Sequence, residues 1–308
     1  MKKISIVLGN GFDLNLMLRT SYSDFAKSRE FCNLPKSSPL NKYVDTTNPE
    51  KSLYAHLQSV FDRQNWFDIE EEIYRYASKL NNIPRLLPLE FDSIKDALKL
   101  YLIRVVKNTM PCQESLAYQF MKNVIEDSDS EISIFNFNYT NCLTLCNCNL
   151  RDKVYYCNIH GDLTSDIVLG YYDYKNMFSD NTVSFMDKSF MLRKAGFGIS
   201  TKLKEANDVI FFGHSLNPMD FSYFKSYFDY VVKAAPADRS LAFICLDGES
   251  ILDIKWKLKT QGYDIRLLHD NLNNVDFIRT HNWNERNEKD VTIYDQLINR
   301  LYTTGTGE

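Results

Sequence analysis

The chain has 308 residues and a formal net charge of −4, and 44% of its residues are hydrophobic. This composition allows a buried core, and the length allows one large domain with an insertion or two domains. The acidic balance argues against general nucleic-acid binding, which needs a basic face for the phosphates. The seven cysteines show no secreted disulfide pattern, and no apolar run reaches the ~18 residues that span a bilayer. We therefore expect a cytoplasmic protein with no membrane partner.

Short apolar runs that end in Gly, Asn or Asp predict buried strands. The runs lack polar alternation, which is typical of parallel strands covered on both faces. Helical patterns lie between several of them, as in a doubly wound α/β fold. The sequence therefore predicts a Rossmann-like, mostly parallel sheet. The predicted strands are Ile4–Leu8, Ile132–Phe137, Val154–Ile159, Ile167–Leu169, Val209–Phe212, Leu241–Leu246 and Ile265–Leu268.

The segment 21–129 has no clear strand pattern. Apolar residues recur at helical spacing from Trp66 to Leu80 and again from Ile94 to Val105. The segment is far longer than an ordinary crossover between parallel strands. We predict a helical insertion over 21–129 that covers the sheet, and a Rossmann-like nucleotide-binding core made of 1–20 and 130–302. Residues 303–308 are expected to form a flexible tail.

The first predicted strand ends in Gly9, Asn10, Gly11, Phe12 and Asp13. Glycines let backbone N–H groups approach a phosphate, and the N-terminus of a following helix favours an anion. The third glycine of the dinucleotide fingerprint is absent, because position 14 is Leu. The motif indicates a phosphate site, and a tight turn without a ligand is the alternative.

Two other predicted strands also lead to polar residues. Asn138, followed by Tyr139 and Thr140, carries an amide that suits a ribose hydroxyl or a positioned water. The alternative is that Asn138 caps a helix or closes a turn. His160, next to Gly161, is a candidate general base, and a structural histidine is the alternative.

A strand, a glycine and small polar residues recur at Gly213, His214 and Ser215, before a helix expected near Met219. The pattern resembles a nucleophile elbow, and Ser215, Asp247 and His269 follow the hydrolase order Ser, Asp, His. The second glycine of the elbow is missing, so this hydrolase interpretation is the weaker one.

Two other clusters have simpler interpretations. The cysteines between residues 142 and 157, with His160, suggest zinc, but they include no Cys-x-x-Cys pair, and we expect no metal. The acids from Asp68 to Glu72 lie at a predicted helix start, where we expect a solvated face. A pocket role for Asp68 or Glu70 is the alternative.

Taken together, these motifs resemble the bacteriophage abortive-infection AbiH family. The resemblance extends from residue 1 to about residue 300 and implies a bacterial protein of phage defence. The blocks that carry it are Gly9–Asp13, Thr20–Phe25, Trp66–Glu70, Phe137–Thr140, His160–Gly161 and Gly213–Asp220.

The order of the motifs also resembles, more loosely, the sirtuin-like NAD-binding domains of antiphage enzymes that destroy NAD. Thr140 stands where that pattern has Asp, and the sirtuin zinc ribbon is absent. The resemblance implies a role for each matching residue. Gly9 and Gly11 would line the pyrophosphate, Asn138 would hold the nicotinamide ribose or a water, His160 would be the base, and Gly213 with Ser215 would contact the adenosine half.

The expected function is an antiphage effector that binds NAD or a related nucleotide and hydrolyses its N-glycosidic bond. We expect a homo-oligomer that responds to a phage-derived trigger. The alternatives are a non-catalytic sensor and a nuclease whose acids Asp13, Asp24 and Glu70 converge on a metal. Asn138 and His160 are the predicted catalytic residues, and the predicted ligand contacts are Gly9, Asn10, Gly11, Phe12, Asp13, Asp24, Tyr139, Gly213, His214, Ser215 and Asp220.

Overall fold

The computed structural model divides into two compact units. The sheet unit comprises Met1–Leu18, Met110–Ile159 and Lys194–Glu308, and the helical unit comprises Arg19–Thr109 and His160–Arg193. These units are defined by contacts, so the domain bounds predicted from the sequence, an insertion over 21–129 within a core, stay a prediction. The structure describes residues 1–36, 47–63, 68–80, 84–127, 129–172, 185–188, 198–234, 236, 238–281, 283 and 287–302. The predicted tail at 303–308 lies outside these ranges.

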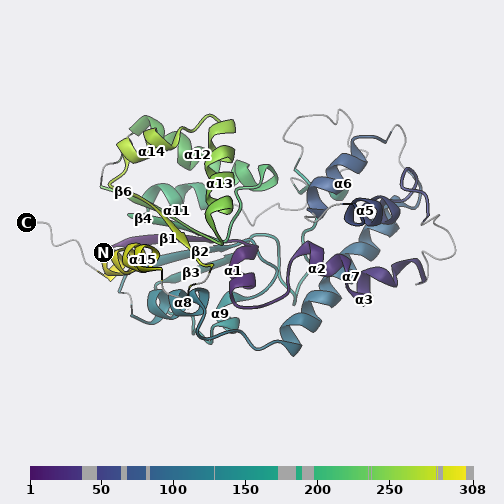
Figure 1. Ribbon diagram of the computed structural model, residues 1–308, viewed down its shortest axis with the longest axis horizontal. Helices are drawn as coiled ribbons and strands as arrows, with labels where there is room; N and C mark the ends of the chain where they lie inside the picture. The colour runs from purple at the N-terminus through teal and green to yellow at the C-terminus, as the bar shows by residue number, and fades with distance from the viewer. Residues whose placement is uncertain are drawn as a thin grey trace, which may run out of the picture. The chain divides into compact units, whose positions relative to one another are not determined.

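The sheet unit is built on six parallel strands in the order β3-β2-β1-β4-β5-β6 (Figure 1). The order reverses direction between β1 and β4, as it does in Rossmann folds. The predicted fold class, a Rossmann-like and mostly parallel α/β sheet, is confirmed. The strands are β1 (Lys3–Leu8), β2 (Glu131–Asn136), β3 (Val154–Asn158), β4 (Asp208–Phe212), β5 (Ser240–Cys245) and β6 (Asn274–Arg279).

Five of the seven predicted strands are present, and two predictions are wrong. Ile265–Leu268 lies in the helix α14 (Ile265–Asn271), whose first turn is capped by Asp264. Ile167–Leu169 joins no strand, although the Val168 N–H donates to the His160 carbonyl at 2.8 Å. The sequence pattern also missed β6, because this edge strand mixes polar and apolar residues and is only partly buried.

Helices cover both faces of the sheet (Figure 1). On one face, Phe211 packs against Phe224 and Phe243, with ring centroids 5.1 and 5.2 Å apart. On the opposite face, Phe212 packs against Phe12 and Phe120 at 5.2 and 5.5 Å, because successive side chains of a strand alternate between faces. The first face carries α11 (Ile199–Glu205), α12 (Pro218–Ala234), α13 (Gly248–Thr260) and α14, and the second carries α1 (Asn10–Asn15), α8 (Leu116–Asp127), α9 (Cys142–Leu145) and α15 (Glu288–Tyr302).

The helical unit contains α2 (Tyr22–Ala26), α3 (Arg29–Cys32), η1 (Leu34–Lys36), α5 (Leu53–Phe61), α6 (Ile69–Ala77) and α7 (Leu87–Asn108). Side chains satisfy the free N–H groups at several helix starts. Asp68 accepts hydrogen bonds from the first turn of α6, and the buried Glu90 carboxylate accepts from the N–H groups of Leu53 and Tyr54 at 3.1 and 2.9 Å. Trp66, predicted to open the stripe on α6, lies outside the described residues.

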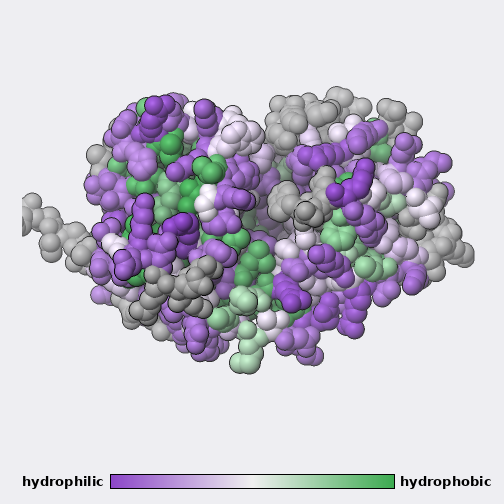
Figure 2. Space-filling view, viewed as in Figure 1, coloured by the Kyte–Doolittle hydropathy of each residue, from purple (hydrophilic) through white to green (hydrophobic). Residues whose placement is uncertain are grey.

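Three further observations concern the surface, the cysteines and the helices. On the face seen in Figure 2, hydrophilic side chains predominate over α5, α6 and α15. All seven cysteines are free thiols. Within the described ranges, no helix combines the length and apolar composition that crossing a bilayer requires.

Candidate functional site

The candidate site of the sheet unit is the carboxyl edge of β1, β2 and β4. Ligands of open α/β sheets bind at this edge, where the strand order reverses. The reversal lies between β1 and β4. After β1, Gly9 caps α1, whose first turn holds Asn10–Asp13. After β4, the turn 213–217 leads to α12, whose first turn holds Asp220, and Asn138 lies two residues beyond β2.

The three glycines of these turns are required for backbone packing. The Gly9 N–H donates to the Phe212 carbonyl at 3.0 Å, and the Gly11 N–H donates to the Gly213 carbonyl at 2.9 Å. A Cβ on Gly9 would lie 2.5 Å from the His214 Cα, and one on Gly11 would lie 2.6 Å from the Gly213 Cα. The turns after β1 and β4 therefore need glycine even without a ligand. The Gly213 N–H donates to the Ile244 carbonyl at 2.9 Å, so all three glycine N–H groups already have partners, and phosphate contact by these glycines stays a prediction.

The buried Asp13 carboxylate lies at the centre of a hydrogen-bonded cluster. Asn138 Nδ2 donates to Asp13 Oδ1 at 3.1 Å and to the Gly9 carbonyl at 3.0 Å. Thr140 Oγ1 donates to Asp13 Oδ2 at 2.6 Å. Burial raises the pKa of Asp13 to about 7, although both side-chain hydrogen bonds act to lower it. Asp13 is thus a carboxyl that titrates near neutral pH.

The same bonds fix the amide of Asn138. Both protons of Nδ2 are engaged, so Oδ1 is the remaining polar atom of the side chain. No described residue donates a hydrogen bond to it. The backbone is also held, because the Asn138 N–H donates to Asn136 Oδ1 at 3.1 Å. Asn138 therefore presents a pre-oriented acceptor that suits a ribose hydroxyl or a water.

A second layer of hydrogen bonds holds this turn against β2 and β3. Asn136 Nδ2 donates to the Thr140 carbonyl at 2.6 Å and to Asn158 Oδ1 at 3.0 Å. The Tyr156 hydroxyl also donates to Asn158 Oδ1, at 2.9 Å. Asn136 and Thr140 were not among the predicted site residues. The sequence pattern that could have identified them is the alternation of asparagine and aromatic residues at the end of a buried strand.

His214 is held between aromatic rings. Its Nδ1 accepts a hydrogen bond from the Leu216 N–H at 3.0 Å, so Nε2 carries the proton and lies 4.0 Å from Asp220 Oδ2. The rings of Phe137 and Phe224 lie 4.7 and 5.1 Å from the imidazole. Contacts within the protein are thus sufficient to hold His214 and Asp220 in place. Their contact with a ligand stays a prediction.

The remaining predicted contacts of the sheet unit differ in exposure. Phe12 is fully buried against Phe212 and belongs to the core. Tyr139 is buried, whereas Asn10, the first residue of α1, and Ser215, in the turn after β4, are exposed. The Ser215 carbonyl accepts a hydrogen bond from Lys257 Nζ at 3.0 Å.

The hydrolase interpretation has no support from hydrogen bonding. Asp247 caps α13, where it accepts from the Ser250 N–H and Oγ, each at 2.8 Å. Within the part of the chain that the structure describes, no hydrogen bond joins Ser215, Asp247 and His269.

In the helical unit, His160 belongs to a buried cluster of charged residues. Lys188 Nζ donates to Glu70 Oε2 at 2.7 Å and lies 3.4 Å from His160 Nε2. All three residues are buried, and so is Glu72, so the predicted solvated face is wrong for Glu70 and Glu72. When Lys188 is charged it can only donate, and Nε2 of His160 must then accept. This contact gives His160 a structural role, and its role as a base stays a prediction.

The three acids of the nuclease alternative each have a different partner. Asp13 accepts from Thr140, Glu70 from Lys188, and Asp24 from Ser21 Oγ at 2.5 Å. The Asp24 N–H also donates to Ser21 Oγ at 3.0 Å, which closes the first turn of α2. Among the described residues, no three His, Cys, Asp or Glu side chains form a group that could hold a metal ion.

An open, all-parallel sheet with polar turns at the carboxyl ends of β1, β2 and β4 defines a Rossmann-like α/β protein. The family model of bacteriophage abortive infection AbiH matches residues 6–236, and the chain belongs to this family. The match confirms the resemblance drawn from the motifs and indicates a role in phage abortive-infection defence. No curated protein sequence matches the chain.

Proposed function

We propose that this AbiH protein is an effector that binds NAD or a related nucleotide at the carboxyl edge of the sheet unit and hydrolyses its N-glycosidic bond. The observation that carries the proposal is the Asn138 amide, which Asp13 and Gly9 hold in one orientation with Oδ1 left to accept. A homo-oligomeric state and activation by a phage-derived trigger belong to the same proposal.

Hydrolysis of the N-glycosidic bond of NAD breaks one bond and forms another at the same ribose carbon. The bond between the ribose C1′ and the nicotinamide nitrogen breaks, and its electron pair leaves with nicotinamide. The oxygen of a water bonds to C1′, and one proton is released. Because nicotinamide leaves as a neutral molecule, the site has to orient the ribose and the water more than it has to activate the leaving group.

Asn138 suits that positioning task. Its Oδ1 would accept a hydrogen bond from a ribose hydroxyl or from the attacking water, and it cannot rotate without breaking two hydrogen bonds. Asp13 would act through Asn138 as a positioning residue, because its own carboxylate is buried. The proton acceptor proposed from the sequence is His160.

The test is NAD loss and nicotinamide release, followed by mass spectrometry with the purified full chain, with and without lysate of phage-infected cells. We expect Asn138→Ala to lose roughly 10²-fold or more in rate, because positioning a reactant supplies a large part of such a barrier. The exposed Asn108→Ala, at the end of α7, is the matched control and should retain the wild-type rate.

Two outcomes would contradict the proposal. One is equal NAD loss in wild type and a folded Asn138→Ala variant, which would remove the role of Asn138. The other is the absence of NAD loss in wild type with the phage lysate present. If NAD still binds in that case, the chain is a sensor, the alternative left open by the sequence.

A further inference from the structure

Lys188 is a buried lysine of the helical unit whose ammonium group contacts two other titratable side chains. Its Nζ donates to Glu70 Oε2 at 2.7 Å and lies 3.4 Å from His160 Nε2. Lys188 is 1% exposed, and Glu70 and His160 are each 4% exposed. A lysine is almost never buried so completely unless it is paired. Because the Glu70 carboxylate favours the charged form of Lys188, a cation lies against the His160 ring.

The three side chains come from distant parts of the chain, and each backbone has its own support. Glu70 lies in the first turn of α6. The Lys188 N–H donates to the Tyr171 carbonyl at 2.7 Å, and the His160 carbonyl accepts from the Val168 N–H at 2.8 Å. None of these backbone bonds involves the ammonium group. Removing that group therefore changes what the His160 ring contacts without removing a bond that holds the His160 backbone.

The contact with Lys188 prevents His160 from acting as a base. A charged ammonium can only donate, so the lone pair of Nε2 is directed at Lys188, and in the neutral ring Nδ1 carries the proton. A general base must present an unprotonated nitrogen to the reactant. Protonation of this ring would also place a second positive charge beside Lys188, which like charges disfavour.

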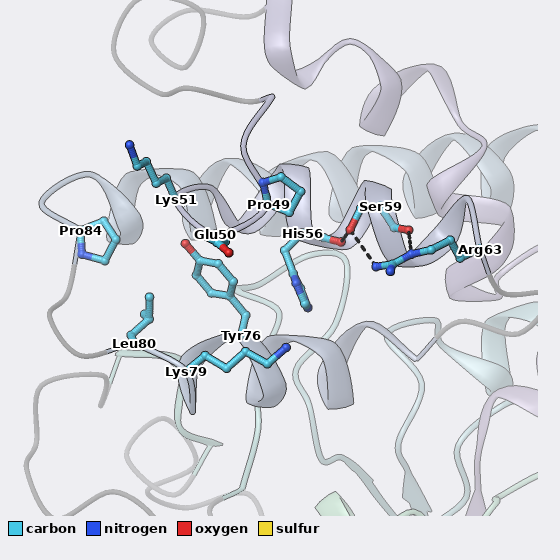
Figure 3. A pocket seen from close by; sticks show the side chains of 10 residues that line it. All are labelled: Pro49, Glu50, Lys51, His56, Ser59, Arg63, Tyr76, Lys79, Leu80 and Pro84. Atoms are coloured by element: carbon cyan, nitrogen blue, oxygen red, sulfur yellow. Dashed lines mark hydrogen bonds between the residues drawn. The ribbon is translucent and has the colours of Figure 1, made fainter.

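The His160 ring is also shielded from solvent. It is 4% exposed, which leaves almost no surface for a water or a ribose to contact. The cavity between α5 and α6, whose lining side chains Figure 3 shows, does not include Glu70, His160 or Lys188 among its lining residues. This cavity therefore gives a reactant no route to Nε2.

Stability alone is a weak reason for a buried ion pair at this position. Replacing such a pair by apolar residues of similar volume is often neutral or stabilising. The chain belongs to a family of phage abortive infection, and an enzyme that hydrolyses NAD would harm its own cell unless it were inhibited. A buried cation that occupies the lone pair of the base would provide that inhibition.

We propose that Lys188 inhibits the protein by holding His160 in a form that cannot accept a proton. The inference rests on the function proposed above, with His160 as the proton acceptor. The described arrangement is then the resting state. Activation moves the ammonium group away from Nε2, and the imidazole becomes able to accept the proton that the attacking water releases.

Removing the ion pair tests the inference in the purified full chain. Lys188→Met and Glu70→Met are combined, because Lys188→Met alone leaves a buried carboxylate without its cation and endangers the fold. NAD loss is measured without phage lysate. We expect the double variant to exceed the basal wild-type rate by roughly 10²-fold, the contribution typical of a general base. Adding His160→Ala should return the rate to the basal level.

Two further measurements separate inhibition from a general loss of stability. Arg279→Met removes the cation 2.9 Å from the buried Asp290 of the sheet unit and should leave the basal rate unchanged. Thermal melting of every variant shows which are folded. Nitrogen NMR of the chain with labelled histidine, in which His160→Ala identifies the resonances, should show Nε2 without a proton in wild type and a changed Nε2 shift in the double variant.

Three results would overturn the inference and leave the proposed function in place. The first is a folded double variant with the basal rate, while wild type loses NAD in the presence of phage lysate. The second is a rate gain that persists when His160→Ala is added. The third is a proton on Nε2 of His160 in wild type. Absence of NAD loss in every protein, with lysate present, would reject the proposed function and this inference together.

Discussion

Replacing Asp13 by asparagine should change how stability depends on pH. The pKa of this carboxyl rises from its ordinary value of 3.8 to about 7, chiefly through burial. Between these two values the folded chain holds a proton that the unfolded chain has released. The free energy of unfolding therefore falls as pH rises from about 4 to about 7, and it levels off above.

The size of the effect follows from the shift. About three pKa units, at ~1.36 kcal/mol each, correspond to about 4 kcal/mol of stability lost across this window. Asparagine has nearly the same shape and does not titrate. It can accept from Asn138 through its oxygen, so the cluster can persist in the variant.

Urea unfolding of wild type and Asp13→Asn, at a series of pH values across this window, measures the difference. We expect the variant to gain stability relative to wild type as pH rises, with the gap constant above about pH 7. Parallel stability curves for the two proteins would refute the reasoning, because they would show that Asp13 titrates alike in the folded and unfolded chain.

Three other predictions follow from packing and charge. Gly11→Ala should lower the free energy of unfolding by ~2 kcal/mol or more, whereas Gly248→Ala, where a Cβ meets nothing within 4 Å, should leave it unchanged. Equal melting points of the two variants would contradict the packing role of Gly11. Lys188→Met should cost ~3–5 kcal/mol, because it removes the cation paired with the buried Glu70 carboxylate, and adding Glu70→Met should recover part of the loss. Strictly additive losses in chemical denaturation would argue against the pair. His160→Ala should slow NAD loss by ~10²-fold or more if His160 is the base, and a folded variant with the wild-type rate would leave it only its structural role.

The apolar runs of the sequence were sufficient to predict most of the sheet. β4 and β5 are buried at every residue, so their runs are unbroken and easily recognised. Ile265–Leu268 has the same local appearance but forms a helix, because a short apolar run does not by itself distinguish a strand from a helix. β6 was missed because an edge strand is covered less completely and tolerates polar residues.

The residues at the carboxyl edge were visible in the sequence by their type and by their place after a strand. Their partners were not, because hydrogen bonds between residues distant in the chain leave no local pattern. Asn138 and Asp13 are 125 positions apart, and Lys188 and Glu70 are 118 apart. Sequence by itself determined that polar groups end these strands. Only the tertiary structure decided that Asp13 orients Asn138, that the glycines serve the packing of two turns, and that His160 adjoins a buried ion pair, since burial and distance exist only in the folded chain.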